Sequence, residues 1–201
     1  MLIQRAGTGT LPPPGFTTPP WKTLVQQWNS IPNPSSRTVT LGPDTLVMGH
    51  DDSEADDADP ALVSDVKDHI FGWDNESPRR EVQVSQFRID WRPITNGEFL
   101  VFWDKNGRNG GVPPSWVEID GEIFVRTVHG PVPMSVAEKW PVLASFDQLS
   151  DYASSKGGRL PTEPELRLFF DKYESGFENG ANVGFRNWHP VPYVFSRSNI
   201  L

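Results

Sequence analysis

The fold of this 201-residue chain is decided first by one stretch, Arg92-Pro93-Ile94-Thr95-Asn96-Gly97-Glu98-Phe99, which marks the start of a helix. Thr95 and Glu98 have the spacing of a capping box, in which each side chain accepts a hydrogen bond from the backbone N–H of the other residue. The aromatic residues that follow recur on one helical face: Phe99, Phe102 and Trp103. We therefore predict a helix that begins after Thr95, buries an aromatic face and ends near Asn106-Gly107.

Two more capping boxes occur in the second half of the sequence. Ser145 with Gln148 opens a predicted helix that ends at Gly157-Gly158, because Gly readily takes the left-handed conformation found after helix ends. Thr162 with Glu165 opens a further helix, in which Glu165 serves as a cap. The sequence therefore predicts three capped helices.

Short β-strands are expected before the first capped helix. Residues 38–41 and 45–48 are rich in β-forming residues and flank Gly42-Pro43-Asp44, which suggests a hairpin. Residues 81–91 alternate polar and apolar side chains, but their apolar residues do not all keep one parity, so we expect a bulge near Gln86-Phe87. With 20 Pro and 17 Gly residues, the chain is expected to form a loop-rich α+β fold with few short strands.

The N-terminal residues differ in composition from the rest. Residues 1–20 are rich in Pro, Gly and Thr, so little of their surface could repay the entropy of ordering. A short helix is predicted next, because four apolar residues share one helical face: Trp21, Leu24, Val25 and Trp28. We divide the chain into a Pro-rich linker carrying this helix, 1–36, a folded part, 37–192, and a divergent tail, 193–201.

Overall composition argues against several classes of function. The formal net charge of −8 does not suit nucleic-acid binding, which needs clustered Lys and Arg. The absence of Cys excludes disulfides and thiolate metal ligands. No segment approaches the roughly 18 apolar residues of a membrane span, and no secretory signal is visible. We expect a cytoplasmic protein that binds neither nucleic acid nor membrane.

Residue chemistry alone identifies no active site. Carboxylates gather between residues 51 and 59, but the segment lacks the Gly that a calcium loop uses for its sharp turn, so a solvated loop is expected: Asp51, Asp52, Glu54, Asp56, Asp57 and Asp59. The four His residues are His50, His69, His129 and His189. An iron triad can be drawn from His50, Asp52 and either His129 or His189, but their spacing favours it over no other set.

Three strings, taken in order, resemble the domain of formylglycine-generating enzymes. They are Arg92–Phe99, Trp140–Val142 and Gly157–Arg167, the last of which is similar to the G-G-R-L-P-T-E-x-E segment of that family. The resemblance implies a fold related to C-type lectins. It also implies that Arg159 serves the fold as a buried ion-pair partner.

Further strings are similar to the fungal type of ergothioneine synthase: Phe71–Arg80, Val125–Pro133 and Ala181–Pro192. In that family, a sulfoxide synthase couples hercynine, a histidine betaine, to a cysteine thiol with non-haem iron(II) and dioxygen. Three His of a preceding DinB-like helical domain hold the iron. The resemblance implies that this chain shapes the pocket for the betaine and thiol substrates, and that it packs against a DinB-like domain in cis or in trans.

The departures from the family limit what these residues can do. Family members continue beyond the segment that ends at Pro192 with a G-N-V-W-E-W-T segment, so the chain is expected to be the front portion of the domain, truncated at its C-terminus. It is expected to hold no cofactor and no catalytic residue of its own. The resemblance places substrate binding at Trp188 and His189, and a structural calcium ligand at Asn182; Asn182 as the cap of a turn is the alternative.

Two other interpretations stay open at this stage. The chain could be a non-catalytic binding or interaction module, because a fold does not determine a function. It could also be an incomplete gene product that does not fold stably, in which case exposed aromatic residues and unpaired strands are expected.

Overall fold

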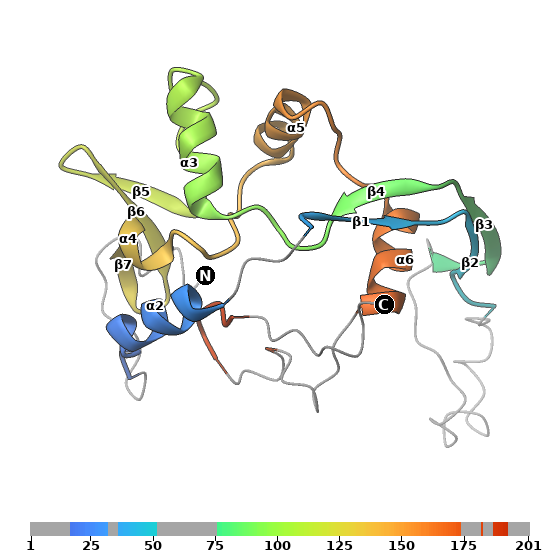
Figure 1. The fold of residues 1–201 in the computed structure, drawn as a ribbon, viewed down its shortest axis with the longest axis horizontal. Helices are drawn as coiled ribbons and strands as arrows, with labels where there is room; N and C mark the ends of the chain where they lie inside the picture. Colours follow the sequence, from blue (N-terminus) through green and yellow to red (C-terminus); the bar gives the residue numbers. More distant parts are fainter. Residues whose placement is uncertain (1–16, 32–35, 52–75, 174–181, 183–186, 193–201) are drawn as a thin grey trace, which may run out of the picture. The chain divides into compact units, whose positions relative to one another are not determined.

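Helices and short strands alternate in the computed structural model of the chain, which describes residues 17–31, 36–51, 76–173, 182 and 187–192 (Figure 1). The mixed composition confirms the predicted α+β class. In chain order the elements are α2 (Trp21–Ser30), β1 (Thr38–Leu41), β2 (Asp44–Met48), β3 (Arg80–Val84), β4 (Phe87–Asp90), α3 (Asn96–Lys105), β5 (Trp116–Ile119), β6 (Glu122–Thr127), β7 (Gly130–Pro133), α4 (Met134–Ala137), α5 (Phe146–Ser155) and α6 (Glu163–Tyr173).

The chain divides into two compact units. Unit 1 takes its described residues from Met1–Arg37, Asp90–Leu160 and Ser175–Leu201, and unit 2 takes them from Thr38–Ile89 and Pro161–Glu174. Within the described part of the chain, no helix is long and apolar enough to cross a membrane. The sequence-based boundaries at residues 36 and 192 stay predictions.

Unit 1 contains a three-stranded antiparallel sheet in the order β5-β6-β7, which the sequence analysis missed. Its first turn is Asp120-Gly121, where both residues have positive φ, 52° and 84°. That pairing is typical of a two-residue hairpin turn and was the available sequence signal. The second turn is Val128-His129, where the Thr127 hydroxyl accepts from the His129 N–H at 3.0 Å and donates to the Gly130 carbonyl at 2.7 Å.

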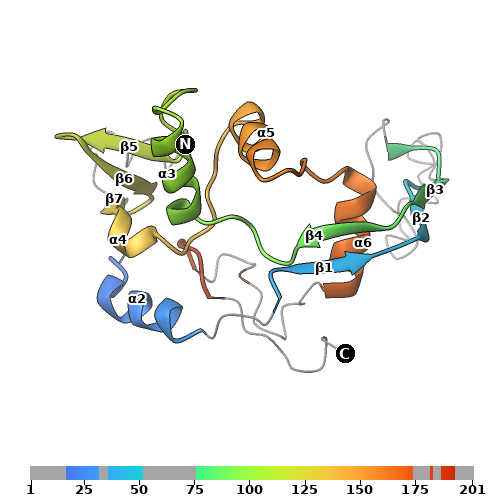
Figure 2. The same cartoon turned by 45° about the horizontal axis from the view of Figure 1, so that its top comes forward.

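Aromatic side chains fill the core of unit 1. Phe99 and Trp103 of α3 are almost fully buried, as the sequence predicts, and both rings contact Trp116 of β5 edge-on at 5.8 Å. Phe99 and Phe102 also contact Tyr152 of α5, so the two helices lie side by side (Figure 2). These large rings provide the burial that such a short set of elements needs.

The start of α3 forms as its sequence predicts. The Thr95 hydroxyl accepts from the Glu98 N–H, and the Glu98 carboxylate accepts from the Thr95 N–H at 2.9 Å, which completes the capping box. The helix ends at Lys105 with Asn106 as its C-cap, close to the predicted end. A Cβ on Gly97 would lie 2.6 Å from the Glu138 side chain, so glycine lets the first turn approach the chain after α4 closely.

Asn96 connects this helix start to two other segments of unit 1. Its Nδ2 donates to the Ala137 carbonyl at 2.9 Å, and its Oδ1 accepts from Trp116 Nε1 at 2.8 Å. Its backbone N–H donates to the Trp140 carbonyl at 2.8 Å. Because Asn96 is only 1% exposed, every one of these bonds lies in the core.

The remaining predicted helices are confirmed. Ser145 and Gln148 form the capping box of α5, and Gly157 has the expected positive φ of 73° just after its end. At α6 the Glu165 carboxylate accepts from the backbone N–H and the hydroxyl of Thr162 at 2.7 and 3.1 Å, so Glu165 acts as the predicted cap. Helix α2 also forms, and Trp28 is its buried residue.

The predicted hairpin between β1 and β2 is wrong. In unit 2, β1 pairs with β4 and β2 pairs with β3, so the two neighbouring strands belong to different sheets. Gly42 between them has a φ of 74°, and a Cβ there would lie 2.9 Å from the Ser85 carbonyl oxygen. The chain at Gly42 therefore lies against Ser85 and does not form a hairpin turn. Ser85 and Gln86 separate β3 from β4, so the irregularity predicted near Gln86-Phe87 is present.

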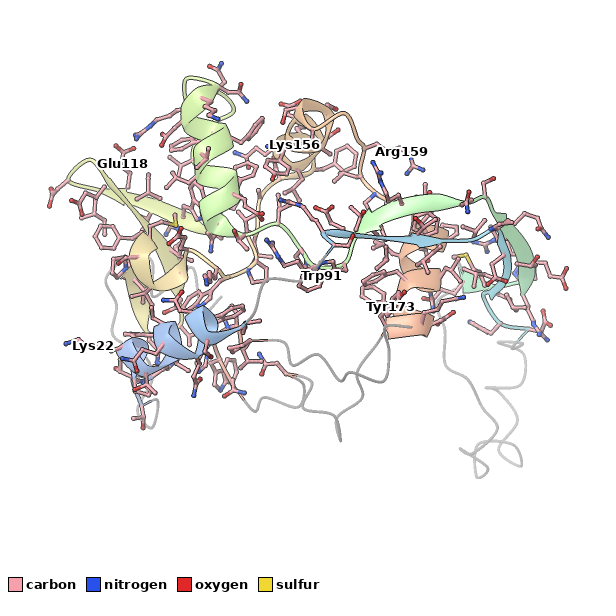
Figure 3. The ribbon with its side chains drawn as sticks, viewed as in Figure 1. Lys22, Trp91, Glu118, Lys156, Arg159 and Tyr173 are labelled. Atoms are coloured by element: carbon pink, nitrogen blue, oxygen red, sulfur yellow. The ribbon has the colours of Figure 1, made fainter. Side chains whose placement is uncertain are left out.

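Helix α6 covers the core of unit 2, where its Leu168 packs against Leu41 and Val84. Tyr173, at the end of this helix, packs against the same cluster (Figure 3).

Arg159 does not occupy the predicted buried position. It lies in unit 1, after the helix stop at Gly157, and its side chain is exposed while Nη1 donates to the Leu160 carbonyl at 2.9 Å. Residues 158–162 form neither helix nor strand, and the Arg159 side chain lies at the surface of this connection. The prediction of burial is wrong.

Replacement of Asn96 tests the role of this residue in unit 1. We expect Asn96→Ala to lower the free energy of unfolding by about 2–4 kcal/mol, because the Trp116 N–H and the Ala137 carbonyl lose their partners inside the core. Asn109→Ala, at an exposed position in the loop after α3, is the control and should change stability little. Urea denaturation of both variants measures the difference, and equal stabilities would contradict the role of Asn96.

Candidate functional site

Four aromatic side chains from distant parts of the sequence meet in unit 1. The ring of Trp21, at the start of α2, lies 5.9 Å from the ring of His129 and 5.9 Å from that of His189, both edge-on. It also contacts Trp140 at 5.7 Å, and Trp140 is almost fully buried. We call this group the Trp21 cluster.

The charge of one imidazole of the Trp21 cluster acts on the other. Burial lowers the pKa of His129, and the positive charge of His189 lowers it further. The neutral imidazole of His129 is therefore favoured, and a neutral ring can accept as well as donate a hydrogen bond. His189 Nδ1 lies 2.9 Å from the Pro190 carbonyl, which can only accept, so Nδ1 of this ring carries a proton.

The residues predicted from the family resemblance lie near one another. The Asn182 Nδ2 donates to the His189 carbonyl at 3.1 Å, while its Oδ1 accepts from Asn187 at 3.2 Å. His189 is half-buried against Trp21, whereas Trp188 is 41% exposed. Substrate binding by Trp188 and His189 stays a prediction.

Metal binding has no ligand set in the described part of the chain. No group of three or more His, Asp or Glu side chains there could hold a metal ion, so the described residues do not fit an iron(II) site. Of the triad drawn from the sequence, Asp52 lies outside the described residues. The same holds for His69 and for the other acidic residues of the 51–59 segment after Asp51. A calcium ligand at Asn182 stays a prediction, and the structure gives this side chain two local hydrogen bonds.

A separate cavity of about 250 Å³ lies between α3 and α5. Its walls are aromatic on the α3 side and polar on the α5 side: Phe99, Phe102, Trp103, Asn106, Asn109, Gly110, Gln148, Asp151 and Ser155. Gln148 closes one end by donating to the carbonyls of Gly110 and Gly111 at 3.1 and 3.0 Å. None of the predicted site residues lines this cavity.

Residues 30–188 match the profile of the family described as "Sulfatase-modifying factor enzyme 1-like domain", also named FGE-sulfatase. The matched segment covers most of the chain and includes the described elements from β1 to α6. The chain belongs to the FGE-sulfatase family. This assignment confirms the family expected from the three strings Arg92–Phe99, Trp140–Val142 and Gly157–Arg167.

The names of several relatives refer to ergothioneine biosynthesis or to hercynine. A protein named "Ergothioneine biosynthesis protein 1" from Schizosaccharomyces pombe is 43% identical over 136 residues, which are 64% of this chain and 18% of that protein. A protein of the same name from Neurospora crassa is 29% identical, over 89% of this chain and 28% of that protein. "Hercynine oxygenase" from Mycobacterium tuberculosis is 32% identical, over 52% of this chain and 28% of that protein. This chain thus spans less than a third of each of these relatives.

Charged side chains form a network around the start of α3. Glu98 accepts from both guanidinium nitrogens of Arg92 at 2.9 and 3.0 Å, and Arg37 Nη1 lies 2.9 Å from its Oε1. Arg37 also pairs with Asp90 at 2.9 Å and hydrogen-bonds the Tyr152 side chain of α5. Glu98 therefore connects the cap of α3 to Arg92 and to Arg37, two residues of unit 1 that lie far apart in the sequence. Through Arg37 it is also connected to α5.

This network sets the protonation of Glu98. Burial acts to raise its pKa, but hydrogen bonds from Arg92 and from the Thr95 backbone, together with the charges of Arg92 and Arg37, outweigh burial and lower the pKa to about 2. The folded state therefore binds this proton less readily than the unfolded state, whose pKa is about 4.3. The stabilisation is complete above about pH 5 and is lost as the pH falls through about 2.

The pH dependence of stability tests the charge network. We expect the wild-type chain to lose stability between about pH 4.5 and 2 more steeply than Glu98→Gln, which should already be weaker at pH 7 by about 1–3 kcal/mol. Glu118→Gln is the control, because Glu118 is an exposed residue of β5 in a 4.0 Å pair with Arg108 (Figure 3). Urea titrations at several pH values measure this, and parallel pH profiles for wild type and Glu98→Gln would refute the network's role.

Proposed function

We propose that this chain is the FGE-type domain of a non-haem iron(II) sulfoxide synthase in ergothioneine biosynthesis, where it binds and positions hercynine and a cysteine thiol. The observation that carries the proposal is the 43% identity to the Schizosaccharomyces pombe protein, supported by the mycobacterial protein named for hercynine. Two names from the same pathway, from relatives in fungi and bacteria, favour this substrate class over an unrelated binding function.

The division of labour follows from the residues present. The bound iron would supply dioxygen activation, and the described residues provide no ligand set for it. We therefore assign this chain a scaffold role, without activity of its own, beside an iron-bearing DinB-like domain in cis or in trans. A fold related to C-type lectins and a cytoplasmic location belong to the same proposal.

The Trp21 cluster suits the proposed substrate. A trimethylammonium group is attracted to the faces of indole rings, and the chain offers two partly accessible indoles near His189, those of Trp21 and Trp188. The half-buried imidazoles of His129 and His189 add hydrogen-bonding groups for a carboxylate or for an imidazole. This combination of aromatic faces and a few polar groups is typical of sites for small amphipathic ligands.

An exchange experiment in Schizosaccharomyces pombe tests this function. The 136-residue segment of Ergothioneine biosynthesis protein 1 would be replaced by the matching segment of this chain, in a strain without the native protein. We expect the cells to make ergothioneine, measured by mass spectrometry. A hybrid protein that accumulates normally but yields no ergothioneine would contradict the proposal.

Site variants in a hybrid whose inserted segment is extended to Pro192 of this chain test the predicted pocket. His189→Ala should reduce ergothioneine by roughly 10-fold or more, because a misplaced substrate reacts slowly. Asn109→Ala, outside the Trp21 cluster, is the matched control and should leave the amount unchanged. Equal ergothioneine from both variants would remove His189 from the substrate site and leave the pathway assignment standing.

A further inference from the structure

Trp21, the central ring of the Trp21 cluster, lies outside the segment that matches the family profile. That segment begins at residue 30, whereas Trp21 lies at the start of α2. The Trp21 ring nevertheless contacts both His129 and His189. An element that precedes the family domain therefore takes part in its candidate site.

Helix α2 has a separate anchor at its other end. Trp28 is 7% exposed and belongs to the main core of unit 1, and its carbonyl accepts from Lys139 Nζ at 3.4 Å. The start of the helix is attached through the Trp21 ring, which packs on Trp140, while its first turn closes with backbone bonds from Thr23 and Leu24 to the Pro20 carbonyl at 2.9 and 3.1 Å. Trp28 thus docks one end of α2 in the core, and at the other end the Trp21 ring contacts the two imidazoles as well as Trp140.

The two imidazoles stand on segments that do not fix their rings by regular structure. His129 is the second residue of the turn between β6 and β7, and His189 lies in residues 187–192, which form neither helix nor strand. A side chain on such a backbone samples several rotamers unless its neighbours restrict it. Edge-to-face contact with an indole supplies such a restriction, because the positive edge of one ring prefers the negative face of the other.

We propose that Trp21 is a positioning residue of the candidate site, and that it holds the imidazoles of His129 and His189 in one arrangement. Helix α2 is then part of the site and more than a linker. The proposal deepens the function proposed above, but it concerns the arrangement of two side chains in this chain alone. It can be tested without substrate, iron or a partner domain.

The protonation of His129 reports whether this arrangement exists. Burial and the charge of His189 lower the pKa of His129, and the Trp21 ring is one of the groups in contact with the His129 ring. His189 is the titratable group in the described part of the chain whose charge acts on His129. Lys139, which follows α4, donates to the Trp28 carbonyl and is not one of the groups that shift the pKa of His129.

Titration of the His129 ring by NMR in the full 201-residue chain tests the proposal. We expect Trp21→Ala and Trp21→Leu to shift the His129 pKa upward towards its ordinary value, because the ring gains solvent and separates from His189. Trp21→Phe keeps an aromatic ring and should retain the lowered pKa of His129. Unchanged titration of His129 in both the Ala and the Leu variant would overturn the proposal.

Trp28→Phe is the matched control on the same helix. It disturbs the docking of α2 but leaves the Trp21 ring, so the His129 pKa should stay lowered. An upward shift in Trp28→Phe as large as that in Trp21→Leu would show that only helix docking matters, and would also overturn the proposal. If Trp21→Ala fails to fold by circular dichroism, the Leu and Phe variants decide the question. Loss of ergothioneine in the hybrid protein has no bearing on this outcome.

Discussion

The buried side chain of Asn96 is the constraint on which the order of unit 1 depends. One amide group joins the start of α3 to β5 through Trp116 and to α4 through Ala137. An amide has both a donor and an acceptor, so it can satisfy a buried indole N–H and a buried carbonyl at once, which no aliphatic residue can do. The capping box of Thr95 and Glu98 surrounds this residue, and the Arg92–Glu98–Arg37 pairs extend the same helix start towards Tyr152.

The candidate site depends on this framework. Trp140, whose carbonyl accepts from the Asn96 N–H, is also the buried ring beneath Trp21. Trp116 is the first residue of β5, and the His129 turn joins the other two strands of the same sheet, β6 and β7. Asn96 therefore bonds to the backbone of Trp140, on which Trp21 packs, and to Trp116 of the sheet that carries the His129 turn. Membership of the FGE-sulfatase family explains why such a framework is present, while helix α2 starts before the segment that the family profile covers.

The helices could be predicted from the sequence because their signals are local. In each capping box the partners are three residues apart, so Thr95, Ser145 and Thr162 mark helix starts whatever the rest of the chain does. Strand pairing is not local: β1 and β2 resemble a hairpin, yet each pairs with a strand more than 30 residues away. The turn at Asp120-Gly121 had a recognisable signal and was overlooked. The meeting of Trp21, His129 and His189 had none, since it joins residues more than 100 positions apart.

The most direct test of this account is a set of NOE measurements between the Trp21 indole protons and the Cε1 protons of the two imidazoles in the full chain. Ring centroids 5.9 Å apart and edge-on bring protons of neighbouring rings within NOE range, so cross-peaks from Trp21 to both His129 and His189 are predicted. No cross-peak is expected between the Trp28 indole protons and either imidazole. The absence of both Trp21 cross-peaks in a folded sample would contradict the account.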